Sequence, residues 1–447
     1  MLKTFIVFVV LLFYAPVLVA QEAGGNLGML TLKSALITAL DNNFDIKIAV
    51  NESDQAKANN TAGNAGMLPT ISAAGGVSGS ITDAHIELAT GVVQDRKGAQ
   101  SYTVSGIAQL NWVLFDGMRM FVNKRKLEAL NEAGLINWRS QIQATVAAVT
   151  NAYARVVREQ QQLVAIDTAM SLAKVRMDIA KRKFEVGTSA KTDYLQAQVD
   201  YNASKSDWLT QNAVLRQAKD SLLVQMGGSE FADYDVTDSL PLNLNLSYRN
   251  ADDWINQNFD MQMARQQLLQ NQYDVDLANK AQLPTLTMNA AYNYNRTQNG
   301  AGVTLYNRTY GPQGSLSLNF PIFDGFNLQR QKKLAHLAFQ RQDLIVQRLQ
   351  ANINAQYRTA WRAYENALKG LKLEQENIGY AAENVMIQQA RFKVGVANTI
   401  ELREAENSYV AALTRLADAR FTVKITETRL LRLENSYDVP PPYFDKK

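Results

Sequence analysis

The side chains that most often carry catalysis or hold metals are scarce in this chain. It has no cysteine and only two histidines, His85 and His336, in 447 residues. A thiolate nucleophile is excluded, and a histidine-based triad or zinc site has little to draw on. The segment Gly75-Gly76-Val77-Ser78-Gly79 does not fit a nucleophile elbow and falls on a predicted strand. We therefore predict that the protein is not an enzyme and has no cofactor or metal site.

The charges of the chain are nearly balanced. Lysine and arginine number 46, aspartate and glutamate number 42, and the formal net charge is +4. A nucleic-acid-binding surface usually needs a strong basic excess, so no nucleic acid partner is predicted. The 12 methionines are scattered, which ranks the handling of a soft metal such as copper or silver low.

The N-terminal residues predict export. Lys3 supplies a positive charge, the run from Phe5 to Tyr14 is apolar, and Ala20 is a small residue suited to cleavage. Residues 1–20 therefore predict a secretory signal peptide, with a retained membrane anchor as the alternative. No later stretch reaches the roughly eighteen apolar residues that a spanning helix needs. Any membrane span of the mature chain would have to be built from strands.

Short motifs recur in the two halves of the chain, which indicates a tandem duplication. The second set follows the first by 215 positions early in each half and by 208 positions later. We predict one repeat over residues 21–240, a second over 241–439 and a C-terminal tail over 440–447. The matching pairs are Asn43-Phe44-Asp45 with Asn258-Phe259-Asp260, Leu68-Pro69-Thr70 with Leu283-Pro284-Thr285, Leu114-Phe115-Asp116-Gly117 with Ile322-Phe323-Asp324-Gly325, and Phe184-Glu185-Val186-Gly187 with Phe392-Lys393-Val394-Gly395.

Each predicted repeat contains a long stretch that favours helix. No proline falls between residues 122 and 240 or between 324 and 439. Apolar residues there recur at spacings of three and four, which is typical of a coiled-coil seam. The predicted seam is Val149, Tyr153, Val156, Leu163, Met170, Ala173, Met177, Ala180 and Phe184 in the first repeat, and Tyr357, Trp361, Tyr364, Leu368, Leu371, Ile378, Ala381, Val385 and Phe392 in the second.

Each long helix is predicted to turn back at a glycine. Gly187 and Gly395 suit a helix C-cap, and helix-forming sequence resumes a few residues later. Short connections make antiparallel neighbours. Coiled-coil hairpins are therefore predicted over about 121–227, with the tip at 186–190, and over about 327–437, with the tip at 394–398.

Segments with a period of two lie between these helices. Strands are predicted over about 70–83, 101–114, 285–296 and 313–322. Segments of about ten alternating residues are typical of transmembrane strands, with one face to lipid and one to water. A half-buried strand of a soluble sheet is the alternative, but the signal peptide and the aromatic residues near the strand ends favour the membrane.

Four strands in one chain cannot close a barrel, and lipid does not tolerate an open sheet edge. A spanning assembly therefore needs more than one copy. Two copies would supply eight strands around an interior filled by side chains. Three copies would supply twelve strands, which begin to leave a lumen.

Taken in order, the motifs resemble those of the TolC family of outer-membrane efflux and secretion channels over essentially the whole mature length. The resemblance is carried by the helix that opens at Asn42-Asn43-Phe44-Asp45, the Leu-Pro-Thr segments at Leu68 and Leu283, the Phe-Asp-Gly segments at Phe115 and Phe323, and the tips 184–193 and 392–401. No single motif is specific, but the duplicated set in this order is.

The resemblance implies a mixed α/β membrane protein. Two tandem repeats would each give two transmembrane strands and one coiled-coil hairpin. A homotrimer would form a twelve-stranded β-barrel in the cell outer membrane, in contact with its lipid, and a twelve-helix α-barrel through the periplasm. Its partners would be a periplasmic adaptor and an inner-membrane transporter of the RND or ABC type. The implied function is an exit duct of a tripartite efflux pump or a type I secretion system.

The resemblance also implies roles for residues at the tips. Glu401 and Glu404 match acidic rings that close the entrance in better-studied members, and Asp193 matches an aspartate on the other hairpin. In those members a tyrosine and an arginine interact to stabilise the closed state, and the matching positions here are Phe392 and Ala397. Because this chain lacks both residue types there, that interaction cannot form. The residues expected to dock the adaptor are Val186, Gly187, Thr188, Val394, Gly395 and Val396.

Two questions stay open at the level of sequence. A periplasmic coiled-coil adaptor or structural protein is the alternative function, although it does not explain the four alternating strands. The exported cargo, small molecule or protein, cannot be assigned from the residues.

Overall fold

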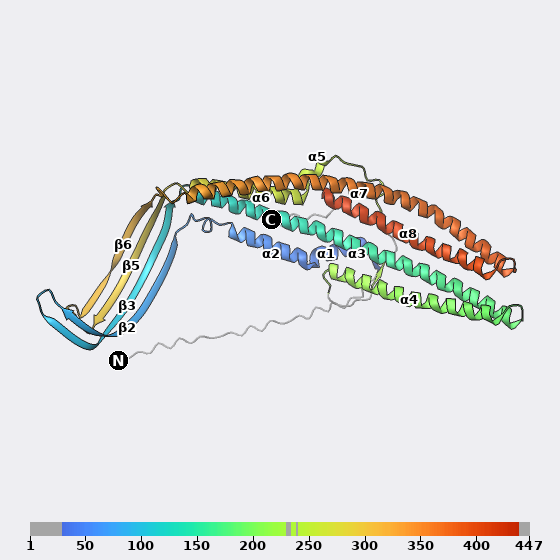
Figure 1. Ribbon diagram of the computed structural model, residues 1–447, viewed down its shortest axis with the longest axis horizontal. Helices are drawn as coiled ribbons and strands as arrows, with labels where there is room; N and C mark the ends of the chain where they lie inside the picture. The colour runs from blue at the N-terminus through green and yellow to red at the C-terminus, as the bar shows by residue number, and fades with distance from the viewer. Residues whose placement is uncertain (1–28, 229–233, 238–239, 438–447) are drawn as a thin grey trace.

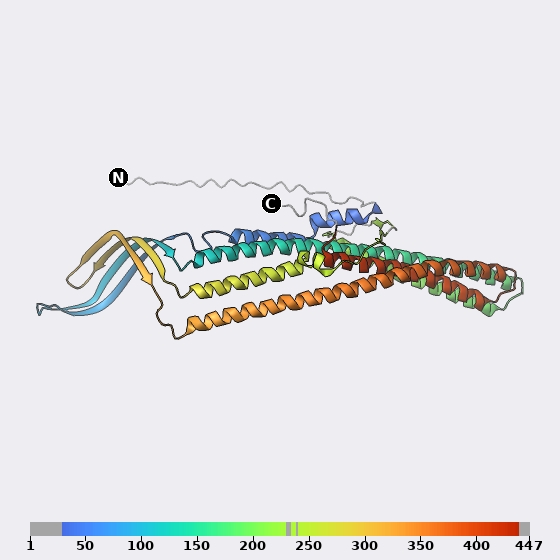
Figure 2. The same ribbon diagram turned by 90° about the horizontal axis from the view of Figure 1, so that it is seen from above.

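The structure of the chain is a computed structural model that describes residues 29–228, 234–237 and 240–437. The predicted signal peptide and the predicted tail over 440–447 lie outside the described residues. The chain is long and thin, with a β-sheet at one end and helices that run from it to the opposite end (Figure 1). The view from above shows α3, α6 and α7 leaving the sheet side by side (Figure 2).

One antiparallel sheet contains the four long strands, in the order β2-β3-β5-β6. The strands are β2 (Thr70–Glu87), β3 (Val93–Phe115), β5 (Thr285–Asn299) and β6 (Tyr306–Asn319). Strands β3 and β5 join the two halves of the chain, with Ser101 opposite Asn299. In the described chain the outer edges of β2 and β6 have no strand partner.

The strand bounds differ from the predicted ones at both ends. At the hairpin ends the strands are longer, because backbone pairing also holds polar segments without an apolar alternation. Glu87 pairs with Val93, so β2 passes residue 83 and β3 starts before residue 101. Strand β5 likewise passes residue 296 to end at Asn299, and β6 starts at Tyr306 rather than at 313. At the other end β6 stops at Asn319 rather than at 322, because its partner strand β5 begins at Thr285, the residue that pairs with Asn319.

Two helical hairpins extend from the sheet. They are α3 (Arg119–Glu185) with α4 (Lys191–Gln225), and α7 (Asn327–Lys393) with α8 (Thr399–Glu434). Helices α3 and α7 each have 67 residues, which corresponds to about 100 Å at about 1.5 Å per residue. Helix α3 contacts both α4 and α8, so it joins the two hairpins. Among the described residues, none of the helices carries an apolar stretch long enough to cross a membrane.

Shorter helices flank the two hairpins. They are α1 (Leu32–Asn42), α2 (Phe44–Asn59), α5 (Ala251–Trp254), the 3-10 helix η1 (Ile255–Gln257) and α6 (Phe259–Lys280). Helix α2 packs along α3, and α6 packs between α3 and α7.

The repeated Asn-Phe-Asp motif has a structural explanation. Asn43 and Asn258 are the N-caps of α2 and α6, where their side chains accept hydrogen bonds from backbone amides of the first turn. The Nδ2 group of Asn43 donates to the carbonyl of Gln225 over 2.8 Å, and that of Asn258 donates to the carbonyl of Leu433 over 2.9 Å. Each asparagine therefore starts one helix and holds the end of another.

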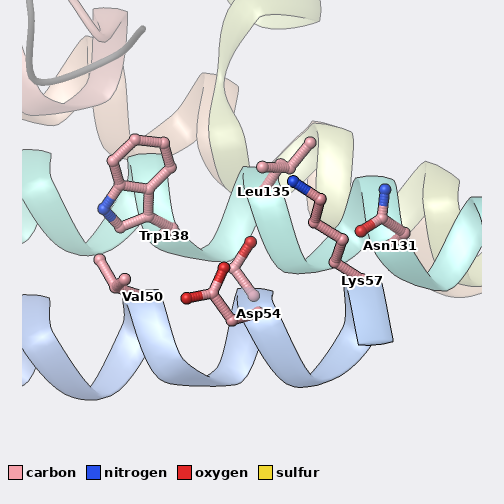
Figure 3. A pocket seen from close by; sticks show the side chains of 7 residues that line it. Val50, Asp54, Lys57, Asn131, Leu135 and Trp138 are labelled. Atoms are coloured by element: carbon pink, nitrogen blue, oxygen red, sulfur yellow. The ribbon is translucent and has the colours of Figure 1, made fainter. Parts of the chain in front are cut away.

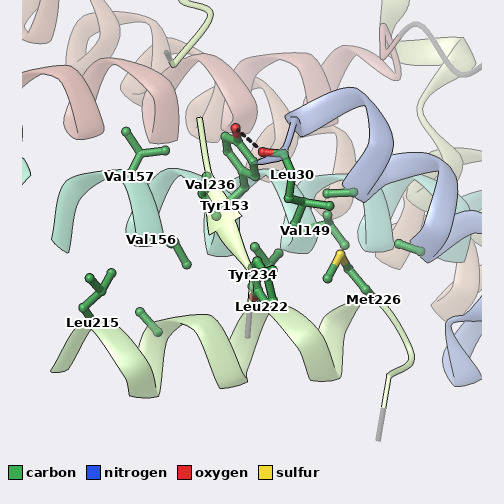
Figure 4. Packing of buried hydrophobic residues seen from close by; sticks show 13 residues of the cluster. Leu30, Val149, Tyr153, Val156, Val157, Leu215, Leu222, Met226, Tyr234 and Val236 are labelled. Atoms are coloured by element: carbon green, nitrogen blue, oxygen red, sulfur yellow. Dashed lines mark hydrogen bonds between the residues drawn. The ribbon is translucent and has the colours of Figure 1, made fainter. Parts of the chain in front are cut away.

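The first core cluster lies where β1 (Met29–Leu30) and β4 (Asp235–Val236) pair across α3 and α4 (Figure 4). The hydroxyl of Tyr153 is within 2.7 Å of Thr237 Oγ1 and donates to the carbonyl of Leu30 over 3.3 Å. A second cluster packs α7 and α8 around Trp254, Tyr357 and Tyr364. Both clusters lie along the predicted seams.

Most residues of the predicted seams are buried or partly buried, but one of them, Phe184, is exposed. Val149, Tyr153 and Val156 are buried in the first hairpin, as are Tyr357, Tyr364, Leu371, Val385 and Phe392 in the second. Phe184, expected in the seam, is 38% exposed and stacks on Tyr194 of α4 with ring centroids 6.4 Å apart. It lies two residues before the turn, where few side chains remain to cover it.

Candidate functional site at the helical tips

The hairpins turn at residues 186–190 and 394–398, at the end of the molecule far from the sheet (Figure 1). Gly187 and Gly395 have φ angles of +76° and +81°. A Cβ atom added at either glycine would meet nothing within 4 Å, so the backbone conformation, and not lack of space, favours glycine there. The amide of Thr188 donates to the carbonyl of Lys183 over 2.8 Å, which closes the end of α3.

The turns expose apolar side chains. Val186, Val394 and Val396 are 73%, 75% and 67% exposed, and Thr188 is exposed beside them. Ile400, in the first turn of α8, is 69% exposed. Exposed apolar side chains gathered at one end of a chain are suited to contact with another protein.

The two predicted gate glutamates lie on one face at the start of α8. The Asn398 side chain accepts from the amide of Glu401 over 2.8 Å and donates to its carboxylate over 3.0 Å. Arg391 lies 3.9 Å from the same carboxylate, so Glu401 is partly neutralised within the hairpin. Glu404 is exposed and has no salt bridge within the described chain.

Asp193, the third predicted gate residue, lies on the other hairpin. It is exposed in the first turn of α4 and accepts a hydrogen bond from Ser189 Oγ over 2.6 Å. No hydrogen bond or salt bridge joins Asp193 to Glu401 or Glu404 in the described residues. A single chain thus brings the two glutamates together and leaves the aspartate apart.

Phe392 and Ala397 belong to one apolar cluster, in place of the polar interaction that the family resemblance implies at these positions. Both are buried in a cluster with Leu402, and Ile179 of α3 packs against this cluster. The ammonium group of Lys183, also on α3, lies 4.3 Å from the centre of the Phe392 ring. The two hairpins are therefore joined near their tips by packing and by a cation–π contact.

A buried ionic cluster joins the hairpins further from the tips, and the sequence patterns did not indicate it. Arg176 of α3 donates to the Glu406 carboxylate of α8 and, over 3.1 Å, to Asp200 of α4. Arg176 and Glu406 are each 5% exposed. Burial raises the pKa of Glu406; Arg176 opposes this rise, whereas Asp200 adds to it. The sequence contained one signal of this cluster: Arg176 follows the seam residue Ala173 by three positions, a spacing that places both on the same face of the helix.

A second polar layer connects the same two helices. Arg158 of α3 lies 3.6 Å from the Asp418 carboxylate of α8 and 4.9 Å from the centre of the Phe421 ring. Gln162 donates to Asp418 over 3.0 Å. Helix α8 is therefore held to α3 at three levels, two polar and one apolar.

Hollows in the surface lie away from the tips. One of about 420 Å³ lies between α2 and α3, beside Val50, Asp54, Lys57 and Trp138 (Figure 3). Another of about 420 Å³ lies where the sheet meets α7. Neither is lined by the predicted gate residues. Within the described ranges, no three histidine, aspartate or glutamate side chains are grouped to hold a metal ion.

The chain matches known export proteins. The family model for outer membrane efflux proteins matches residues 35–228 and 251–436, well over half of the chain. The chain is 26% identical to the outer membrane protein TolC of Vibrio cholerae, over 62% of this chain and 65% of that protein. It is 22% identical to the alkaline protease secretion protein AprF of Pseudomonas aeruginosa, over 94% of this chain and 86% of that protein.

Solved structures show the same fold. The Campylobacter jejuni CmeC outer membrane channel superposes with a TM-score of 0.72 at 18% identity, over 91% of this chain and 85% of that chain. CusC superposes with a TM-score of 0.75 at 17% identity, over 93% of this chain and 95% of that chain. The chain therefore belongs to the outer membrane efflux protein family, whose members are channels of the outer membrane for efflux or secretion.

Proposed function

We propose that three copies of this chain form a closed, passive duct that carries cargo across the periplasm and the outer membrane. The observation that carries the proposal is the sheet with two unpaired edges, β2 and β6, in the described chain. Unpaired backbone groups are costly in lipid, so each edge needs the edge of another copy. Three copies of four strands give a twelve-stranded barrel, and three copies of two hairpins give a twelve-helix tunnel.

Trimeric assembly is favoured over dimeric assembly because a duct needs a lumen. Eight strands enclose an interior filled by side chains, whereas larger barrels leave space. The shortest of the four long strands, β6, has 14 residues, or about 46 Å at about 3.3 Å per residue. That length allows a tilted strand to cross a hydrocarbon core of about 30 Å.

The two halves are proposed to be tandem repeats over 21–240 and 241–439. The family model matches once in each half, and the order strand, strand, long helix, shorter helix occurs in each. The Asn43 and Asn258 caps occupy corresponding places in the two halves.

The tips are proposed to form the periplasmic gate. Glu401 and Glu404, repeated three times, would place six carboxylates around one constriction, with Asp193 on the neighbouring hairpin. The contacts that join α3 to α8, namely Arg176 with Glu406 and Ile179 with the Phe392 cluster, would hold the closed arrangement. Opening would separate the α7–α8 hairpin from α3 at these contacts.

The adaptor is proposed to dock on the turns. Val186, Gly187, Thr188, Val394, Gly395 and Val396 form the exposed end of the chain. An inner-membrane transporter of the RND or ABC type would then deliver cargo. Relatives include an efflux protein, BepC of Brucella suis, and the protease secretion protein AprF, so both small molecules and proteins remain candidate cargo. The family match does not favour a periplasmic adaptor as the function of this chain itself.

Conductance in planar lipid bilayers tests the duct and its gate together. The purified protein should give discrete conductance steps with a preference for cations, because clustered carboxylates attract them. The double variant Glu401→Gln/Glu404→Gln should reduce that preference. The matched control Glu376→Gln/Glu383→Gln, on an exposed part of α7, should not. A protein that inserts without conducting would contradict the duct, and an unchanged preference in the double variant would place the gate elsewhere.

A further inference from the structure

The two longest helices each carry a pair of basic residues at the same position in their second turn. Lys124 and Arg125 are the sixth and seventh residues of α3, and Lys332 and Lys333 are the sixth and seventh residues of α7. Arg330 adds a third cation to the start of α7. Neither helix has an acidic residue in its first turn. The N-terminal end of a helix carries a partial positive charge that favours anions, and this effect is largely confined to the first turn.

The cations of α3 have partners inside the chain. Lys124 makes a salt bridge with Glu128 over 2.8 Å. Arg125 lies 5.9 Å from the centre of the Tyr273 ring. Lys126, the next residue, makes a salt bridge with Asp274 of α6.

The cations of α7 have no carboxylate partner in the described chain. Lys332 donates to the neutral Gln282 side chain over 2.6 Å. Arg330 and Lys333 are exposed and make no salt bridge within the described residues. The Asp324 carboxylate accepts from the backbone amide of Leu328 over 2.7 Å at the start of α7, but it makes no salt bridge with a basic side chain. Three basic side chains thus lie within the first two turns of α7 without a salt-bridge partner in the described chain.

Exposed apolar residues directly precede this basic cluster, where β6 joins α7 (Figure 1). Phe320, Ile322, Phe323 and Phe326 are 57%, 89%, 74% and 63% exposed. The Phe323 and Phe326 rings meet edge to face, 5.4 Å apart, beside the hollow of about 420 Å³ that Lys332 also lines. Phe326 has a φ of +65°, which is unfavourable for a bulky residue. Aromatic residues followed by cations are the sequence of side chains suited to a membrane–water interface.

The spacing along the helix fits the depth of the headgroup layer. Lys333 lies about 9 Å along the axis from Asn327 at about 1.5 Å per residue. A headgroup layer extends about 5–8 Å beyond the hydrocarbon core, and long basic side chains reach several ångströms further. Apolar rings at the strand end and basic groups one to two turns away would therefore meet acyl chains and phosphates respectively.

We propose that the junction of β6 and α7 is a binding surface for anionic phospholipids at the periplasmic face of the outer membrane. Phosphate and glycerol headgroups of negative net charge would supply the counter-charge that Arg330, Lys332 and Lys333 lack. The proposal rests on the proposed function, because only a membrane-embedded sheet brings this junction to a lipid surface. Beyond the proposed function, it specifies that the assembly prefers lipids of negative net charge.

Native mass spectrometry of the full-length protein in detergent tests the lipid preference. The probes are phosphatidylglycerol and phosphatidylethanolamine, added separately at matched concentrations. The unmodified protein should retain more phosphatidylglycerol. The triple variant Arg330→Gln/Lys332→Gln/Lys333→Gln should lose that preference by roughly tenfold or more, given the attraction of each basic residue to anionic lipid. The control Arg358→Gln/Lys369→Gln/Lys372→Gln removes the same charges from exposed positions further along α7 and should keep the preference.

Three results would overturn the proposal. The triple variant could bind phosphatidylglycerol as the unmodified protein does. The control variant could lose as much binding, which would mean net charge alone acts. Inorganic phosphate could compete fully with the lipid, which would mean an anion site without lipid. Bilayer conductance separates this proposal from the duct itself: a triple variant that conducts normally but has lost the preference supports both, and a conducting one that keeps the preference overturns only the lipid surface.

Discussion

Glu406 is a buried carboxylate whose protonation is coupled to the contact between α8 and α3. Burial raises its pKa above the ordinary value of 4.5, Arg176 opposes the rise, and Asp200 adds to it. The folded chain therefore binds a proton at Glu406 more tightly than the unfolded chain does. The stabilisation from this group is fully present below pH 4.5 and is lost as the pH rises through the raised pKa.

The pH dependence gives a test at this residue. Glu406→Gln removes the titration and keeps the size of the side chain. As the pH rises from about 4.5, the thermal unfolding midpoint of the unmodified protein should fall relative to that of Glu406→Gln, measured by circular dichroism in detergent. Glu404→Gln, at an exposed position nearby, should follow the unmodified protein. Parallel curves for Glu406→Gln and the unmodified protein across this range would refute the coupling.

Local signals in the sequence predict part of the tip and not the rest. Gly187 and Gly395 could be placed because a left-handed helix end favours glycine wherever it occurs. The link between Arg176 and Glu406 could not, because 230 positions separate them and nothing local encodes the pairing. Phe184 and Phe392 share a register but differ in burial, since only Phe392 is packed by Ala397, Leu402 and α3.

The helical hairpins are stabilised by their seams. Leu371 is 4% exposed in the core cluster of α7 and α8, whereas Leu373, two residues on, is 59% exposed. Leu371→Asp places an unpaired charge in this core and should cost about 3 kcal/mol or more. Leu373→Asp should cost well under half as much. Thermal unfolding followed by circular dichroism compares the two, and equal losses would show that the seam register is wrong.

The strands were harder to predict than the helices. Alternation marked the central part of each strand, but most of the largely polar residues 93–100 of β3 pair with β2 without any such pattern. Pairing between β3 and β5 joins residues 171 to 198 positions apart, from Phe115 with Leu286 to Ser101 with Asn299, and local periodicity carries no information on that neighbour. The sequence indicated a helix start near Asn43, but the hydrogen bond from the Asn43 side chain to the Gln225 carbonyl depends on tertiary packing.

At the scale of the whole molecule, the long, thin shape and the open sheet edges are both explained by assembly with other copies of the chain. A four-stranded sheet continues into two hairpins, and helix α3, with 67 residues, contacts α4 of its own hairpin and α8 of the other. The same fold occurs in CmeC, an outer membrane channel. In the described part of a single chain, the outer edges of β2 and β6 have no strand partner, so assembly is the central claim of the proposed function.

The mass of the detergent-solubilised protein tests that claim most directly. Light scattering with correction for bound detergent, or native mass spectrometry, gives the protein mass of the assembly. Three chains per particle are expected, because three sets of four strands close a barrel with a lumen. A particle that stays folded and membrane-embedded as one chain, or as two, would contradict the account.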